Sequence, residues 1–65
     1  MTHKEWEKEV RKALIDRDLN QKELADALGL SRQYITMTIN GTVQVQRTID
    51  RISKFVGVEA YTARG

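Results

Sequence analysis

The sequence contains no cysteine and only one histidine, so its 65 residues hold neither a disulfide framework nor the ligands of a zinc site. It also lacks any apolar run near the roughly 20 residues of a membrane span, and its first residues show no signal-peptide pattern. The length fits one small domain over residues 1–65. We therefore expect a cytoplasmic protein with no metal, cofactor, small-molecule ligand or membrane partner.

The sequence has little excess of either charge, because 11 lysine and arginine residues against 9 aspartate and glutamate residues leave a net charge of +2. So small a total does not by itself indicate a nucleic-acid partner. The distribution is more informative, because most acidic residues lie in residues 5–26 and only Asp50 and Glu59 follow. The second half of the chain therefore carries the positive field.

Proline is absent too, so capping residues and glycines must begin and end the helices that the apolar spacing predicts. Thr2 with Glu5, and Asn20 with Glu23, have the spacing of a capping box. A glycine after the last helical residue can adopt the left-handed conformation that ends a helix. The expected helices span residues 2–17, 20–28, 31–40 and 47–56, and Gly29, Gly41 and Gly57 follow the last three.

Two short segments lie between and after these helices. Residues 42–46 alternate polar and apolar side chains, but five residues without a hairpin partner favour a loop over a strand. Residues 58–63 are expected to add one more short turn. His3 is expected to be solvated, whereas Trp6 should seal the first helix against the fourth. The sequence therefore predicts an all-α bundle of four to five short helices, in which the fourth helix buries Ile49, Ile52, Phe55 and Val56.

Only three residues, 29–31, separate the second predicted helix from the third. So tight a connection forces a large crossing angle, and its glycine can take the positive φ that the turn demands. Ala25 is small where the third helix must cross closely, Leu30 and Ile35 can close the wedge, and Ser31 can cap the third helix. This pattern predicts a helix-turn-helix at about residues 21–40, whose second helix can lie in the major groove of DNA.

The order and spacing of ten residues is typical of one family: Gln21, Leu24, Ala25, Leu28, Gly29, Ser31, Gln33, Ile35, Asn40 and Gly41. In these residues, and over roughly residues 6–63, the sequence resembles the lambdoid phage repressor and Cro group of helix-turn-helix regulators, also called Xre-type. The resemblance implies a nucleoid-associated, Cro-like or repressor-type transcriptional regulator of phage or mobile-element origin that binds a double-stranded DNA operator as a homodimer. We expect this homodimer to be weak and to be completed on DNA, because the short C-terminal segment and two loop valines offer too little apolar area for an obligate interface.

The same resemblance implies roles for individual residues. Side-chain chemistry permits these roles, because arginine can bind guanine, glutamine can bind adenine, and methionine can contact a thymine methyl. Tyr34, which we add from its position, either reaches a phosphate or covers the edge of the core. The implied base-reading residues are Arg32, Gln33, Thr36 and Met37, and the implied phosphate-binding residues are Asn20, Gln21, Asn40 and Arg47, joined by Tyr34.

Other interpretations remain open. Met37 fits a protein-binding surface equally well, and Val43 and Val45 either pack under their loop or meet a second subunit. With the uncharged loop 42–46, Met37 supports the alternative function, a module of the same fold that binds a partner protein. An enzyme is not expected, because the chain has no activating base beside a nucleophile and no glycine-rich phosphate loop.

Three departures from the family pattern lead to separate predictions. Several family members carry a buried Arg–Glu pair where this chain has Leu14 and Ile39, so we expect these two side chains to contact each other. Thr38 replaces a buried aliphatic residue, and its hydroxyl can donate to a carbonyl one turn back. The loop at residues 42–46 lacks the usual lysines and arginines, so the electrostatic part of DNA affinity should be modest.

Overall fold

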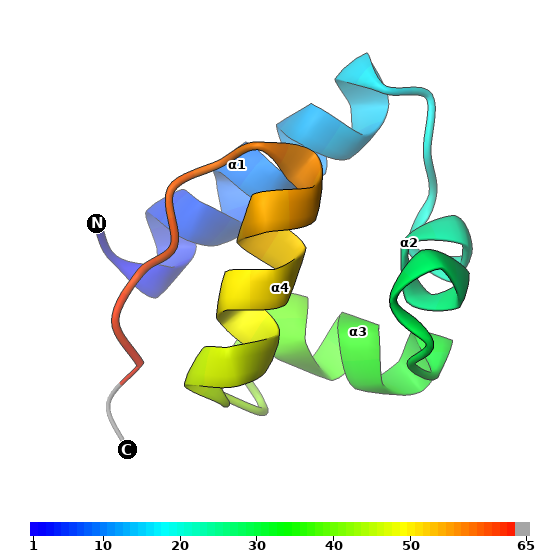
Figure 1. Ribbon diagram of the computed structural model, residues 1–65. Helices are drawn as coiled ribbons and strands as arrows, with labels where there is room; N and C mark the ends of the chain where they lie inside the picture. Colours follow the sequence, from blue (N-terminus) through cyan, green and yellow to red (C-terminus); the bar gives the residue numbers. More distant parts are fainter. Residues whose placement is uncertain (64–65) are drawn as a thin grey trace.

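The computed structural model describes residues 1–63 and shows an all-helical bundle without a strand in that part of the chain (Figure 1). The all-α prediction is confirmed. No helix within residues 1–63 is long and apolar enough to cross a membrane. After the last helix, residues 58–63 return past the start of the first (Figure 1). The helices are α1 (His3–Asp16), α2 (Gln21–Leu28), α3 (Arg32–Asn40) and α4 (Gln46–Val56).

Both predicted capping boxes are present. Thr2 Oγ1 accepts the Glu5 backbone N–H at 3.3 Å, and Glu5 Oε1 accepts the Thr2 backbone N–H at 3.0 Å. Asn20 Oδ1 and the Glu23 side chain form the same reciprocal pair at 2.8 and 3.1 Å. The hydrogen bonds that Thr2 donates from its backbone and side chain lower the pKa of Glu5 below its ordinary value. Local sequence therefore fixes where α1 and α2 begin.

The turn of the helix-turn-helix begins at Gly29, whose φ of 70° ends α2. The Leu30 backbone N–H then donates to the Ala25 carbonyl at 2.9 Å, which closes the last turn. Ser31 Oγ accepts the Tyr34 backbone N–H at 3.1 Å and starts α3 immediately. Ala25 is buried, and the two helices joined by this turn form the predicted helix-turn-helix.

The core lies between α1, α3 and α4 and is closed on one side by α2. Trp6 is fully buried, and its Nε1–H donates to Ser53 Oγ at 2.8 Å, which ties α1 to α4 as predicted. Leu14 and Ile39 belong to the same buried cluster, so both positions of the family's ion pair are apolar here. Thr38 Oγ1 donates to the Tyr34 carbonyl at 2.9 Å, as expected for a buried threonine in a helix.

Phe55 is not buried as predicted, because 44% of its surface is exposed. The core stripe of α4 runs through Ile49, Ile52 and Val56. Phe55 precedes Val56 by one residue and is therefore rotated by about 100° from it around the helix. It lies instead beside Leu28 at the edge of the bundle.

Residues 58–63 do not form the predicted extra turn, so the described chain has four helices. The Gln46 side chain holds this segment in place. Its Nε2 donates to the Tyr61 carbonyl at 2.9 Å, and its Oε1 accepts the Ala63 N–H at 2.7 Å. The segment's backbone groups therefore bond across to α4 rather than to one another. Burial raises the pKa of the Tyr61 hydroxyl.

His3 is half-buried, which corrects the prediction that it is solvated. Its Nε2 lies 2.8 Å from the Ile39 carbonyl oxygen, and its ring lies 5.4 Å from the Tyr61 ring and 6.2 Å from the Trp6 ring. Because the carbonyl can only accept, Nε2 must donate. Gly41, with a φ of 90°, leaves room for this ring, since a Cβ there would lie 2.7 Å from His3 Cε1.

Candidate nucleic-acid interface

The helix α3 has one face in the core and one face toward solvent. Ile35, Thr38 and Ile39 are buried. On the other face, Arg32 and Gln33 are exposed, and their spacing along the helix continues to the half-buried pair Thr36 and Met37. All four predicted base-reading residues therefore keep accessible surface on the second helix of the helix-turn-helix.

A surface hollow of about 500 Å³ lies where α1, α2 and α3 meet. We call it the α1–α2–α3 hollow. It joins two predicted phosphate-binding residues, Asn20 and Gln21, to two predicted base-reading residues, Arg32 and Thr36. The rest of its lining is formed by Arg11 and by apolar side chains that include the largely exposed Ile15. The start of α2 therefore lies beside the outward face of α3, and both line the same hollow.

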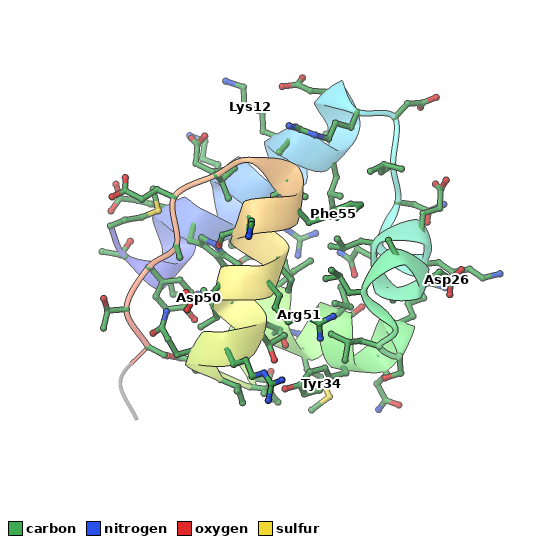
Figure 2. All side chains as sticks on the ribbon, viewed as in Figure 1. Lys12, Asp26, Tyr34, Asp50, Arg51 and Phe55 are labelled. Atoms are coloured by element: carbon green, nitrogen blue, oxygen red, sulfur yellow. The ribbon has the colours of Figure 1, made fainter. Side chains whose placement is uncertain are left out.

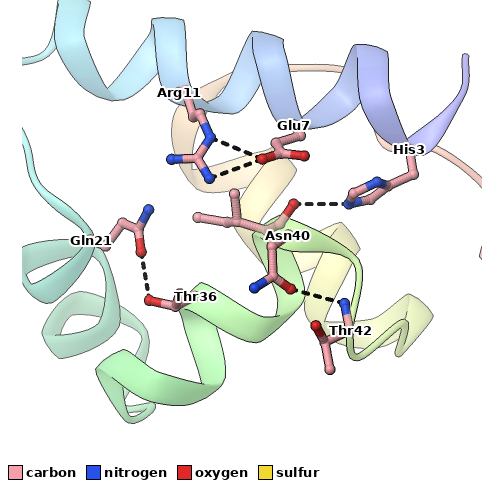
Figure 3. A network of polar contacts seen from close by, with 8 residues as sticks. His3, Glu7, Arg11, Gln21, Thr36, Asn40 and Thr42 are labelled. Atoms are coloured by element: carbon pink, nitrogen blue, oxygen red, sulfur yellow. Dashed lines mark hydrogen bonds and ion pairs between the residues drawn. The ribbon is translucent and has the colours of Figure 1, made fainter.

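Gln21 is the first residue of α2 and is bonded to α3. The Thr36 hydroxyl donates to Gln21 Oε1 at 2.6 Å, and Figure 3 shows the Gln21 amide nitrogen turned away from Thr36. Asn20 Oδ1 is used as a cap, which leaves Asn20 Nδ2 as the donor of that side chain. The first N–H groups of a helix and its dipole favour an anion. The start of α2 therefore offers donors suited to a phosphate.

Arg11 also lines the hollow, although it was not among the predicted phosphate-binding residues. Its Nε and Nη2 donate to Glu7 Oε2 at 3.1 and 2.9 Å (Figure 3). The spacing could have identified it, because Arg11 lies three residues before Leu14, where family members carry an arginine. Residues three apart share a helix face, so Arg11 brings a positive charge to the face from which that arginine is missing.

The other predicted phosphate contacts lie outside this hollow. The Tyr34 hydroxyl lies 3.0 Å from Thr48 Oγ1, so the tyrosine joins α3 to α4 at the edge of the core. Asn40 Oδ1 accepts the Thr42 N–H at 2.9 Å. Arg47 is exposed in the first turn of α4. The Tyr34 hydroxyl therefore already has a partner within the protein.

Arg51 contacts the helix-turn-helix from α4. Arg51 extends from α4 toward α2, where its Nη2 donates to the Leu28 carbonyl at 2.8 Å (Figure 2). This arginine therefore joins α4 to the end of α2.

The two loop valines differ in their surroundings. Val43 is half-buried and its N–H donates to the Met37 carbonyl, whereas Val45 is 43% exposed. The two valines therefore do not share one environment.

Comparison with known proteins agrees with this geometry. Residues 8–61 match a family model described as helix-turn-helix, of the Xre and lambda-repressor-like type. No curated protein and no solved structure gives a significant match to the chain. The match covers α2 and α3 completely, together with α4 and most of α1. The chain therefore belongs to the Xre and lambda-repressor-like helix-turn-helix family, a family of DNA-binding transcription regulators.

Proposed function

We propose that this protein is a Cro-like or repressor-type regulator, of phage or mobile-element origin, that binds a specific double-stranded DNA operator in the cytoplasm. The observation that carries the proposal is the continuity between two surfaces. The outward face of α3 and the donor groups at the start of α2 meet in the α1–α2–α3 hollow. A helix lying in the major groove needs both kinds of group at once, because bases specify the site and phosphates fix the register.

In this proposal α3 enters the major groove. Arg32 binds guanine O6 and N7, Gln33 binds adenine N6 and N7, and Met37 contacts a thymine methyl. Thr36 reads a base beside them. The phosphates flanking the groove are held from two sides, at the start of α2 by Asn20 and Gln21 with Arg11, and beyond the end of α3 by Asn40 and Arg47. Tyr34 adds a hydroxyl at the edge of this second group.

The operator in this proposal has two-fold symmetry, with half-sites about 34–36 Å apart. The large apolar side chains with much exposed surface are few, and they include Ile15, Val45 and Phe55. So few side chains offer little area for an obligate interface, which usually buries about 2,000 Å² or more. We therefore expect mainly monomers in sedimentation at micromolar concentration, with the dimer completed on DNA. A dimer persisting at nanomolar concentration contradicts this.

Selection of bound sequences from a random duplex pool tests the function, followed by affinity measurements at low and high salt. We expect one recurrent two-fold motif and an affinity that falls steeply with salt as counterions are recaptured. Failure to bind any duplex contradicts the proposal. Salt-insensitive binding to a protein instead would favour the alternative module, for which the exposure of Val45 and Phe55 is the supporting observation.

A further inference from the structure

The hydrogen bond between Thr36 and Gln21 has a direction. Thr36 Oγ1 donates its hydrogen to Gln21 Oε1 at 2.6 Å, a short bond between residues that are 15 positions apart in the chain (Figure 3). Both side chains are half-buried and line the α1–α2–α3 hollow. A hydroxyl has only one hydrogen to donate, but it has two lone pairs. Once that hydrogen is given to Gln21, Thr36 can only accept from any further partner.

In the proposed complex, a phosphate bound by Gln21 maintains this direction. Nonbridging phosphate oxygens accept hydrogen bonds, so Gln21 must present its Nε2 hydrogens to the phosphate and keep Oε1 on the other side of the amide. The structure already has this orientation, with Oε1 facing Thr36. Binding of Gln21 to the backbone and donation by Thr36 therefore require the same amide orientation.

We propose that Thr36 selects a base that carries an exocyclic amine in the major groove, because Gln21 restricts the Thr36 hydroxyl to the role of acceptor. Adenine N6 and cytosine N4 donate there, whereas guanine and thymine present acceptors, with thymine adding its methyl group. Hydrogen bonds then run in one direction, from base amine to Thr36, from Thr36 to Gln21, and from Gln21 to phosphate. The inference rests on the proposed DNA-binding function. It makes Gln21 a positioning residue, because Gln21 orients the Thr36 hydroxyl that contacts the base and does not itself touch that base.

The first experiment measures base preference at every operator position for the wild type, Thr36→Ser and Thr36→Val. In the wild type, one position in each half-site should favour adenine or cytosine by about 2- to 12-fold, the net effect of one hydrogen bond. Serine keeps the hydroxyl and should keep the preference. Valine keeps the shape without the hydroxyl, so its preference for adenine or cytosine over guanine should disappear. If the selected base is adenine, replacing it with purine, which lacks the amine, should cost the same factor.

The second experiment changes Gln21 in two ways. Gln21→Ala frees the Thr36 hydroxyl to donate, so guanine and thymine should become acceptable at the Thr36 position. Gln21→Glu still accepts from Thr36 but repels the phosphate. It should therefore bind all sequences more weakly while it keeps the preference for adenine or cytosine. Gln33→Ala is the matched control, because it should alter its own base position and leave the Thr36 position unchanged.

The outcomes distinguish this inference from the function on which it rests. A wild-type preference for guanine or thymine at the Thr36 position overturns the inference and leaves DNA binding intact. An unchanged profile for Gln21→Ala does the same. Failure of the wild type to bind any duplex overturns both. Loss of the preference in Gln21→Ala together with its retention in Gln21→Glu supports the inference, because a general loss of affinity affects both variants.

Discussion

The two ends of α3 are held by different kinds of contact. At its start, the Ser31 hydroxyl caps the helix locally, and at its middle Thr36 bonds to Gln21, a residue of the adjoining helix. At its end, the Ile39 carbonyl meets His3, which is 36 residues away in the chain, and the helix stops at Gly41. The polar groups at the start face a surface hollow, whereas the contacts at the end adjoin the core.

This difference teaches that, under the proposed function, one short helix separates recognition from stability along its length. Residues near the start can change what the helix binds without disturbing the core, because Arg32 and Gln33 are exposed. Residues near the end hold α3 against α1, because Ile39 is fully buried and its carbonyl is bonded to α1. Substitutions at the two ends should therefore give different readouts, one in affinity and the other in the free energy of unfolding.

The largest expected effect is at the buried end. Ile39→Glu places an unpaired charge in the core and should reduce the free energy of unfolding by about 3–5 kcal/mol in denaturant titrations. If Leu14 contacts Ile39 as predicted, adding Leu14→Arg should recover a good part of that loss. Ile35→Glu on the same helix is the control, since Leu14→Arg should not rescue it. A double variant no more stable than Ile39→Glu alone would show that the two side chains do not meet.

A smaller loss of stability is expected at Gly41. Gly41→Ala combines a φ of 90° with a Cβ 2.7 Å from His3 Cε1, so it should cost about 1–3 kcal/mol of unfolding free energy. Gly29→Ala, at the end of α2, is the matched control. Its φ is 70°, but a Cβ there meets no described atom within 4 Å apart from its chain neighbours, so only backbone strain remains. Adding His3→Ala should reduce the cost at Gly41 and not the cost at Gly29; equal effects would contradict the contact.

At the exposed start, the effect should appear in affinity. Gln33→Ala should lose about 1–3 kcal/mol on the selected operator and flatten one base position in each half-site. Its unfolding free energy should change by less than about 0.5 kcal/mol, as for other exposed residues. Gln21→Ala should instead weaken binding to operator and unrelated DNA by similar factors, apart from the position read by Thr36. Equal loss on every sequence for Gln33→Ala would mean that Gln33 is not a base reader.

The same contrast explains what the sequence could and could not predict. The starts of α1 and α2 depend on residues three apart, so the Thr2–Glu5 and Asn20–Glu23 boxes were predictable. The Gly29 turn was predictable from a single glycine after the last helical residue. The environment of His3 was not, because its partners Ile39 and Tyr61 come from distant parts of the chain. The prediction that Phe55 is buried was wrong for a related reason. Helical periodicity shows which face of a helix is apolar, but how much of that face the core covers depends on the neighbouring helices.

The candidate site divides in the same way. Family resemblance indicated four residues of α3 that point outward, of which Arg32 and Gln33 are exposed, whereas Thr36 and Met37 are half-buried. It did not indicate the bond from Thr36 to Gln21, because a hydrogen bond between two helices depends on their crossing geometry. Arg11 was missed because its i,i+4 spacing to Glu7 is also that of an ordinary surface ion pair, whose contribution to stability is small.

The smallest expected effect concerns Glu5, whose capping box begins the helix that places His3 against the end of α3. Because the folded-state pKa of Glu5 is lowered below 4.5, its contribution to stability is present above that pH and is lost as pH falls through the lowered value. The Thr2 backbone N–H is the larger cause and the Thr2 hydroxyl the smaller one. Thr2→Ala removes only the hydroxyl, so the pKa should rise only part of the way toward its ordinary value. A side-chain carboxyl titration followed by NMR measures this, and a complete return to the ordinary value would show that the backbone bond does not survive without the cap.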